Sequence, residues 1–207
     1  MIRSDSDETR KLAAEIISNG GLIAFRTDTF YGVGADPLNA SAVGKIKTLK
    51  GRDEGKPILL LIADLADAEA LLASQPKAFE ILSRAIWPGP LTIVVPAVDG
   101  LPDELTAGTG TVGVRLPGSE EVRGLVRECG GRLTATSANP SGREAAKCAA
   151  DVSEYFATGL DLIVDGGEVT ATQPSTVIDV TGSVPRLLRE GAVSRNEIEG
   201  ALGVPVE

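Results

Sequence analysis

The stretch LIAFRTDTFYGVGADPLNASAVGKIKTLKGRDEGKPILLLIA, residues 22–63, decides the fold. It begins with the short apolar run Leu22–Phe25 and ends with the continuous apolar run Ile58–Ala63. Between these runs, apolar residues recur at helical spacing within Ser41–Leu49. A strand, a helix and a second strand in this order predict an α/β fold.

The same alternation continues on both sides of this stretch. A helix is predicted over Asp7–Asn19, and Gly20 and Gly21 end it. Further strands are predicted at Leu91–Val95, Thr111–Leu116, Leu133–Ser137, Leu160–Val164, Ser175–Val180 and Arg186–Arg189. Further helices are predicted at Leu65–Ala73, Pro76–Ile86, Glu120–Glu128, Ala145–Phe156 and Ser194–Leu202.

Length and composition predict one globular domain over residues 1–207. The chain has 207 residues, 43% of them apolar, which is enough for a substantial core. The longest apolar runs are too short to cross a membrane, and the polar start MIRSDSDETR is unlike a secretory signal. We therefore expect a cytoplasmic protein with no membrane partner.

Charge and residue usage exclude several kinds of chemistry. A net charge of minus 9 counts against a broad basic surface and stable nucleic-acid binding. The chain has no histidine, which removes Ser-His and Cys-His nucleophile systems and histidine metal ligands. Cys129 and Cys148 lack the spacing of a metal site, so no protein metal site is predicted. Catalysis here must depend on positioning and electrostatics.

A basic segment stands out from this acidic chain. Five basic and two acidic residues give positions 45–56 a local charge of plus 3. The sequence KGRDEGK, residues 50–56, follows a predicted helix, and its glycines let the backbone approach a phosphate closely. No Walker pattern is present. The segment is either an anion site or a solvated helix face.

Polar turns follow several predicted strands. TSANPSG, residues 136–142, comes directly after an apolar strand, and it is either a ligand-binding edge or a plain capping turn. RTDTFYGVGAD, residues 26–36, has a similar placement. In the strand at Thr111–Leu116, alternation places Thr111, Gly113 and Arg115 on the face opposite the valines. The arginine is therefore expected to point into solvent or a cleft.

Seven segments occur in an order that resembles one known family. They are TDTFYGVGAD (27–36), KGRDEGKP (50–57), WPGPLT (87–92), VGVRLP (112–117), TSANPSG (136–142), STVIDV (175–180) and LLREGA (187–192). Together they resemble the YrdC/Sua5 family of threonylcarbamoyladenylate synthases from about residue 20 to residue 192. The chain resembles the short form of this family, which lacks an extra C-terminal domain.

The resemblance implies a twisted mixed sheet flanked by helices, with one large concave ligand groove. It implies a nucleotidyltransferase that joins ATP, L-threonine and bicarbonate, with Mg²⁺ carried by ATP and the product passed to a tRNA threonylcarbamoyl transferase complex for t6A modification. The catalytic residues implied are Lys50 and Arg52. The ATP-binding residues implied are Lys50, Arg52, Lys56, Thr111, Ser137, Asn139, Ala145 and Arg189. The threonine-binding residues implied are Thr29, Leu61, Arg115, Ala135 and Ser175.

Three positions depart from the commonest family pattern. Arg26 stands where a proline is frequent, Phe30 replaces a small branched residue, and Leu61 stands where many long-form relatives carry a histidine. The last change leaves the threonine pocket with one polar side chain fewer. Two rival interpretations are an RNA-binding module and the related carbamoyl-transfer domain of hydrogenase maturation proteins. The acidic charge opposes the first, and the lack of cysteine-rich zinc modules opposes the second.

Overall fold

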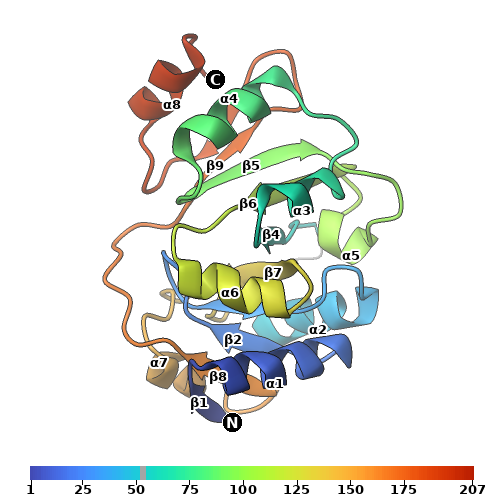
Figure 1. Ribbon diagram of the computed structural model, residues 1–207, viewed down its shortest axis with the longest axis vertical. Coiled ribbons are helices and arrows are strands. Elements are labelled where there is room, and N and C mark those ends of the chain that lie inside the picture. Colours follow the sequence, from blue (N-terminus) through green and yellow to red (C-terminus); the bar gives the residue numbers. More distant parts are fainter. Residues whose placement is uncertain (52–54) are drawn as a thin grey trace.

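The computed structural model describes residues 1–51 and 55–207, and ten strands of these residues form one sheet (Figure 1). The order of strands across the sheet is β1-β8-β2-β3-β7-β4-β6-β5-β9-β10. The strands are β1 (Ile2–Ser4), β2 (Ile23–Phe25), β3 (Gly32–Gly34), β4 (Leu59–Ile62), β5 (Leu91–Pro96), β6 (Thr111–Arg115), β7 (Arg132–Ser137), β8 (Leu162–Asp165), β9 (Thr176–Asp179) and β10 (Arg186–Arg189).

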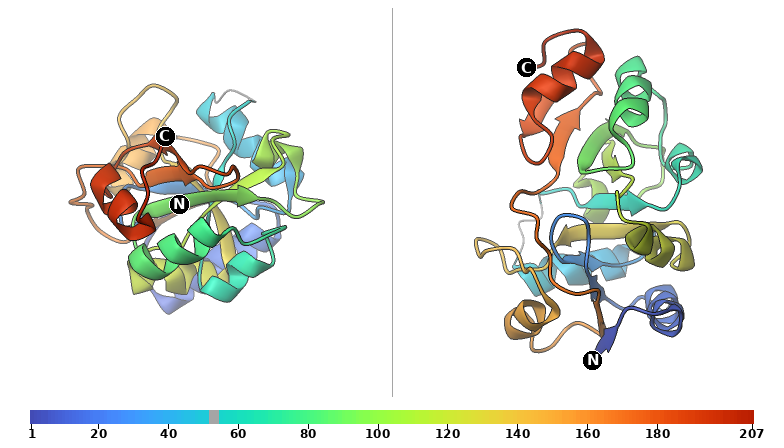
Figure 2. Two further views of the ribbon diagram at one scale, coloured as in Figure 1. Left: turned by 90° about the horizontal axis from the view of Figure 1, so that it is seen from above. Right: turned by 60° about the vertical axis from the view of Figure 1, so that its left-hand side comes forward.

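Helices cover both faces of this sheet. They are α1 (Asp7–Ser18), α2 (Ala40–Lys50), α3 (Leu65–Glu69), α4 (Lys77–Ile86), α5 (Asp103–Thr106), α6 (Glu120–Glu128), α7 (Ala149–Tyr155) and α8 (Arg195–Leu202). In the lower half of the molecule as drawn in Figure 1, which contains β1, β2 and β8, helices α1 and α6 lie side by side on one face of the sheet. Helices α2 and α7 lie on the other face (Figures 1 and 2). No helix of the described residues combines the length and the apolar character that a membrane crossing needs.

The sheet is mixed, as the family resemblance predicted. The parallel pairs are β1 with β8, β8 with β2, β4 with β6, and β5 with β9. The remaining neighbours are antiparallel. After β8, residues 166–175 run along one side of the molecule from the lower half to the upper half, where β9 begins (Figure 2). This linking segment, residues 166–175, therefore crosses the middle of the sheet between β8 and β9.

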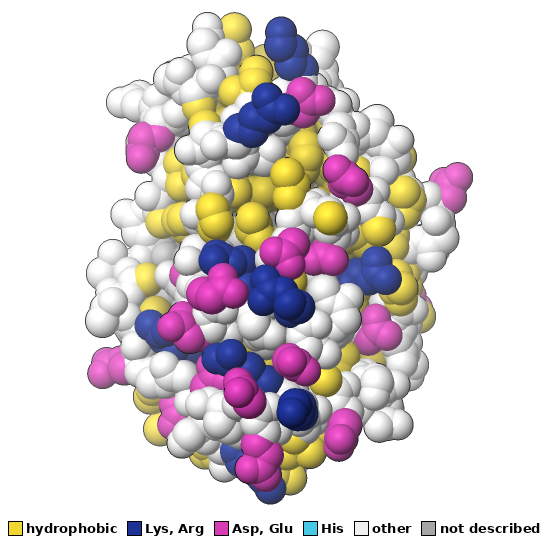
Figure 3. Space-filling model, in the orientation of Figure 1, with side chains coloured by type: hydrophobic (Ala, Val, Ile, Leu, Met, Phe, Trp, Pro, Cys, Tyr) yellow, Lys and Arg dark blue, Asp and Glu magenta, His cyan; other side chains and the backbone are white. Residues whose placement is uncertain are grey.

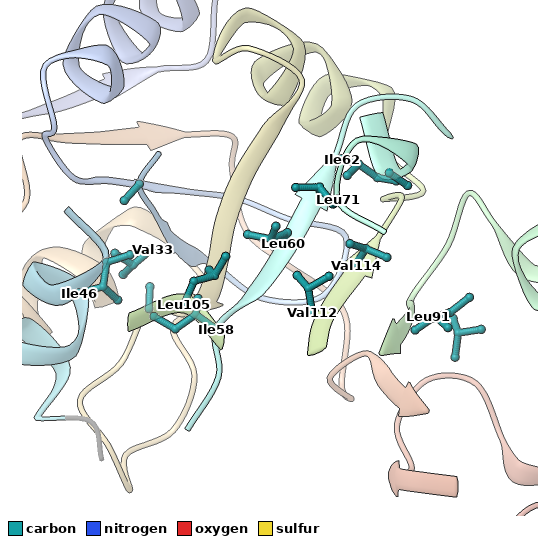
Figure 4. Packing of buried hydrophobic residues seen from close by; sticks show 14 of the residues in the cluster. Val33, Ile46, Ile58, Leu60, Ile62, Leu71, Leu91, Leu105, Val112 and Val114 are labelled. Carbon is teal, nitrogen blue, oxygen red and sulfur yellow. The ribbon is translucent and has the colours of Figure 1, made fainter. Parts of the chain in front are cut away.

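Buried hydrophobic side chains form two clusters: the smaller packs under α1 and α6, and the larger extends from the opposite face of the sheet to β5, β9 and α8. In β2, Ile23 and Phe25 belong to the cluster under α1 and α6, whereas Ala24 belongs to the larger cluster on the opposite face. In β4, Leu60 and Ile62 pack in that larger cluster (Figure 4). Both strands are buried on both faces, which explains their continuous apolar sequences.

The structure differs from the predicted elements at some ends. The predicted helix over Leu65–Ala73 stops at Glu69, because Leu72 forms a bridge to Ala97 at the sheet instead. The predicted helix over Ala145–Phe156 starts only at Ala149. The Asp151 carboxylate accepts hydrogen bonds from the backbone amides of residues 147 and 148 and fixes the helix start there.

Three short elements were not predicted. The strand β3 has the sequence Gly-Val-Gly, and glycine carries no strand preference. The strand β1 has three residues at the sheet edge, all exposed, so no hydrophobic pattern marks it. The helix α5 has four residues. Each element is too short for periodicity to reveal.

Candidate functional site

A central pocket of about 150 Å³ opens near the middle of the sheet. The turn between β2 and β3 forms one wall, and strands β4 to β7 contribute the floor. The linking segment supplies the opposite wall just before β9. The lining residues are Thr27, Thr29, Phe30, Tyr31, Gly32, Leu59, Leu61, Thr92, Arg115, Ala135, Thr136, Ser137, Pro174, Ser175 and Arg189.

The threonine turn after β2 is held by its own side chains. The hydroxyl of Thr27 donates to the carbonyl of Phe30 at 2.6 Å and accepts from the amide of Thr29 at 3.1 Å. The two threonine hydroxyls lie 3.1 Å apart, and both residues are buried. This side-chain-to-backbone bonding replaces regular pairing and fixes Thr29 in the pocket wall.

Arg115 is buried at the base of this wall. Its Nη2 donates to Oδ1 of Asp28 at 2.8 Å, and its Nη1 donates to the hydroxyl of Thr29 at 3.2 Å. Its Nε is buried with no hydrogen-bond partner among the described residues. Burial lowers the pKa of Arg115, and the charge of Asp28 opposes this shift. Of the two positions predicted for Arg115, solvent or a cleft, the structure shows the cleft, and the guanidinium is already anchored on one side.

The strand that carries Arg115 needs a glycine two residues earlier. A Cβ atom at Gly113 would lie 2.5 Å from Cδ2 of Leu59 and 3.3 Å from Cγ2 of Thr92. Both of these side chains line the pocket. Glycine at this position leaves room for both side chains against β6, at the floor of the pocket.

The opposite wall is a small hydrogen-bonded group. The hydroxyls of Thr92 and Ser175 lie 3.1 Å apart and are buried. Arg189 donates from Nε and Nη2 to the carbonyl of Ser175, at 3.1 and 2.8 Å, and from Nη2 to its hydroxyl at 3.2 Å. These bonds place a second guanidinium at the pocket rim.

Lys50 is buried behind the TSANPSG turn. Its Nζ donates to the carbonyl of Ser137 and, at 2.8 Å, to the carbonyl of Asn139. The amide of Ser141 in turn donates to the carbonyl of Lys50 at 3.0 Å. Lys47 and Lys50 are each only 3% exposed, so the interpretation of these two lysines as a solvated helix face is wrong. Through these hydrogen bonds, Lys50 connects the C-terminal end of α2 to the TSANPSG turn.

The structure brings together about half of the residues implied by the resemblance. The central pocket is lined by Thr29, Leu61, Arg115, Ala135, Ser137, Ser175 and Arg189. Lys50 and Asn139 adjoin it through their bonds to Ser137. Lys56, Thr111 and Ala145 do not line it, and Thr111 is at the far end of β6 from Arg115. Arg52 lies outside the described residues.

Some lining residues were not among the predicted site residues. They are Thr27, Phe30, Tyr31, Gly32, Leu59, Thr92, Thr136 and Pro174. Two of these residues, Leu59 and Thr27, could have been found from the sequence. Leu59 is two positions before Leu61 and thus shares its strand face, and Thr27 mirrors Thr29 across Asp28.

The described lining of the central pocket is basic, whereas the chain is acidic, and one of its two guanidinium groups, Arg115, is paired with Asp28. Two guanidinium groups line it, and no carboxylate is among its described lining residues. Figure 3 shows acidic and basic side chains intermixed over the lower half of the visible face, without a broad basic patch. Within residues 1–51 and 55–207, no group of three or more acidic or cysteine side chains could hold a metal ion. The pocket therefore suits an anionic group of a small molecule.

Comparison with known proteins gives the family. The family model for Sua5, YciO and YrdC proteins, described as telomere recombination, matches residues 15–191. The threonylcarbamoyl-AMP synthase of Pyrococcus abyssi is 39% identical over 193 residues, which are 93% of this chain and 57% of that protein. That of Thiobacillus denitrificans is 40% identical over 171 residues, which are 82% of this chain and 90% of that protein.

A solved structure agrees with this result. The crystal structure of Pyrococcus abyssi Sua5 complexed with L-threonine matches with a TM-score of 0.93 and 36% identity, covering 100% of this chain and 61% of that one. The chain thus spans less than two thirds of the Pyrococcus protein. The predicted family is confirmed: the chain belongs to the Sua5/YciO/YrdC family.

Proposed function

We propose that this chain is an L-threonylcarbamoyladenylate synthase. It would join ATP, L-threonine and bicarbonate and release pyrophosphate, as a nucleotidyltransferase serving t6A modification of tRNA. The observation that carries the proposal is the buried Arg115 beside the hydroxyl of Thr29 in a pocket with no lining carboxylate among the described residues. Relatives that share the fold are named threonylcarbamoyl-AMP synthases, and one related structure holds L-threonine.

The central pocket has room for an amino acid but not for a whole nucleotide. Its volume is about 150 Å³. We assign the threonine carboxylate to Arg115 and its polar groups to the hydroxyls of Thr29 and Ser175, with Leu61 and the backbone at Ala135 beside them. A charged pair with a buried guanidinium gives the orientation that a hydroxyl alone would not.

ATP would then lie outward from this pocket, across the TSANPSG turn. Ser137 and Arg189 line the central pocket, so they would connect the two parts of the site. Asn139 is 7% exposed, and its Oδ1 has no hydrogen-bond partner within the described part of the chain, so it is available to a ligand donor. Arg52, Lys56, Thr111 and Ala145 complete the nucleotide side as predictions from the family pattern.

Mg²⁺ would enter with ATP. The described lining of the central pocket supplies hydroxyls and guanidinium groups, which are not the carboxylate ligands that Mg²⁺ prefers. The phosphates of ATP are therefore the fitting ligands for the ion, which would neutralise charge on them. The protein itself would position the two anions, the threonine carbamate and ATP, for attack in line with the leaving group.

The proposed reaction needs no protein nucleophile. The threonine amine combines with bicarbonate, with loss of water, to give a carbamate. A carbamate oxygen attacks the α-phosphorus of ATP, the bond from that phosphorus to the bridging oxygen breaks, and pyrophosphate leaves. Arg115 and Thr29 hold the carbamate's parent amino acid in position, and the basic groups at the rim offset the charge of the phosphates. A chain without histidine can perform this chemistry.

Pyrophosphate release tests the proposal directly. We expect pyrophosphate only when ATP, L-threonine and bicarbonate are all present, because the carbamate cannot form if any carbon or nitrogen source is missing. The measurement is an enzyme-coupled pyrophosphate assay with each substrate omitted in turn. Equal release without threonine would mean an ordinary ATPase and would end the synthase proposal.

A second test concerns Arg52, which the family pattern places at the phosphates. We expect Arg52→Lys to weaken ATP binding almost as much as Arg52→Ala, by about tenfold, because lysine lacks the planar pair of donors that a phosphate accepts. The measurement is ATP titration by calorimetry. Wild-type affinity in the lysine variant would show that Arg52 is only a surface charge.

The remaining partners belong to the same proposal. The product would pass to a tRNA threonylcarbamoyl transferase complex in the cytoplasm, without stable binding of tRNA by this chain. The net charge of minus 9 supports the proposal that this chain does not bind tRNA stably, because phosphate backbones bind basic surfaces.

A further inference from the structure

A second pocket lies on the α1/α6 face of the sheet, beneath the two helices. Its volume is about 300 Å³. No residue of its lining is shared with the central pocket. The lining residues are Ser4, Asp5, Arg10, Phe25, Arg26, Glu121, Val122, Leu125, Val164, Asp165 and Gly166.

This pocket stands at the carboxyl ends of three adjacent parallel strands. Ser4 at the end of β1 pairs with Asp165 at the end of β8, and Phe25 at the end of β2 pairs with Val164. Arg26 follows Phe25 directly. In open α/β sheets, this edge is where ligands bind, because side chains and free backbone groups converge beyond the strand ends.

Arg26 has a buried hydrogen-bond donor that points to a ligand. Its Nε is buried, yet it finds no hydrogen-bond partner among the residues that the structure describes. A Cβ atom at Gly166 would lie 3.0 Å from Cβ of Arg26 and 3.1 Å from its Cδ, so the glycine leaves room for the arginine stem. A buried donor without a partner costs free energy, which a ligand that accepts the hydrogen bond would recover.

The other charges in the pocket limit the kind of ligand. Arg10 is neutralised by Asp5, with hydrogen bonds of 2.7 and 3.0 Å. Oδ1 of Asp165 accepts the hydroxyl of Tyr31 at 3.1 Å and the amide of Gly167 at 2.9 Å. Glu121 also lines the cavity, and its Oε2 accepts the hydroxyl of Ser119 at 2.6 Å. Carboxylates therefore outnumber guanidinium groups, three to two, which disfavours a polyanion such as a nucleotide.

We propose that this second pocket binds an α-amino acid with a small apolar side chain. The carboxylate of the ligand pairs with Arg26, and its ammonium group lies toward Asp165 and Glu121. Its side chain packs on the apolar part of the lining, which is formed by Phe25, Val122, Leu125 and Val164. An amino acid of this kind matches the positive group, the negative groups and the apolar surface of the pocket at the same time.

Tyr31 connects the second pocket to the central one. Tyr31 lines the central pocket, and its hydroxyl donates to Asp165, which lines the second. Arg26 is also the chain neighbour of Thr27 in the central wall. An occupant of the second pocket thus contacts Asp165 and Arg26, which adjoin residues of the central pocket, and the binding proposed here does not depend on the proposed synthase activity.

Calorimetric titration with L-valine tests this site, because valine has the shape of threonine without the hydroxyl. We expect one molecule to bind, and Arg26→Ala to weaken its binding by about tenfold to a hundredfold. Glu121→Gln, at an exposed residue, should weaken it by about tenfold. Arg84→Ala, at an exposed arginine on α4, should leave valine affinity unchanged, and Arg115→Ala shows how much of the valine binding belongs to the central pocket.

Two valine analogues identify what the pocket recognises. Isovalerate lacks the ammonium group and isobutylamine lacks the carboxylate, so both should bind at least tenfold more weakly than valine. Isovalerate binding as tightly as valine would show an anion site and overturn the proposal. So would the absence of valine binding, unchanged affinity in Arg26→Ala, or loss of binding in Arg115→Ala alone.

Discussion

Replacing Arg115 by alanine is expected to weaken L-threonine binding by about a hundredfold, with a much smaller effect on ATP. A charge-assisted hydrogen bond to a carboxylate contributes up to about 3 kcal/mol, which corresponds to this factor. Two nitrogens of Arg115 are held by Asp28 and Thr29, so the guanidinium is positioned before the ligand arrives. Separate titrations with threonine and with ATP measure the two effects.

The same substitution also removes half of an ion pair. The carboxylate of Asp28 is only 15% exposed, and without Arg115 it would remain a poorly solvated charge. We expect a loss of about 3 kcal/mol in the free energy of unfolding, measured by urea denaturation. The double variant Arg115→Ala/Asp28→Asn should recover most of this stability but not threonine binding. If ATP binding fell instead, the division of the site into two parts would be wrong.

Replacing Lys50 by methionine is expected to reduce stability by about 3 kcal/mol and to abolish detectable ATP binding. The buried carbonyl of Asn139 would lose its ammonium donor, and an unsatisfied buried group costs about 1 to 3 kcal/mol, whereas the carbonyl of Ser137 would keep the amide of Asn139. Methionine matches the length of lysine, so packing is largely kept. Denaturation curves and ATP titrations report the two effects.

Lys11→Met provides the matched control, because Lys11 is exposed on α1. It should change neither stability nor ATP affinity. A Lys50→Met variant that kept full stability but lost ATP binding would mean that Lys50 contacts the nucleotide directly. In that case its bonds to the turn would not be its main contribution.

Most of the sheet could be predicted from the sequence, because its strands are apolar runs bounded by turn residues. The run Ile58–Ala63 became β4, and the helix at Glu120–Glu128 was correct to the residue. What periodicity could not supply was the partner of each strand. The pairing of β1 with β8, for example, joins Ile2 to Ile163. Such contacts depend on the whole fold.

Only part of the candidate site could be predicted, because contacts between distant segments also depend on the whole fold. Alternation in β6 correctly set Arg115 apart from the valines, but it could not show that Asp28 lies beside it, 87 positions earlier in the chain. Lysine is usually exposed, so nothing local indicated that Lys50 is buried. The order of the motifs identified the family, whereas the contacts around each charged group required the structure.

The position of β8 between β1 and β2 has a consequence for synthesis on the ribosome. Both strands lie within residues 2–25, whereas the strand that separates them, residues 162–165, is made well after them. At about 5 to 20 residues per second, the roughly 140 intervening residues take about 7 to 28 s to be made. Throughout that interval the nascent chain exposes two unpaired strand edges, which makes it a substrate for chaperones and prone to aggregation. Slowing translation before residue 162 should therefore lower the yield of folded protein.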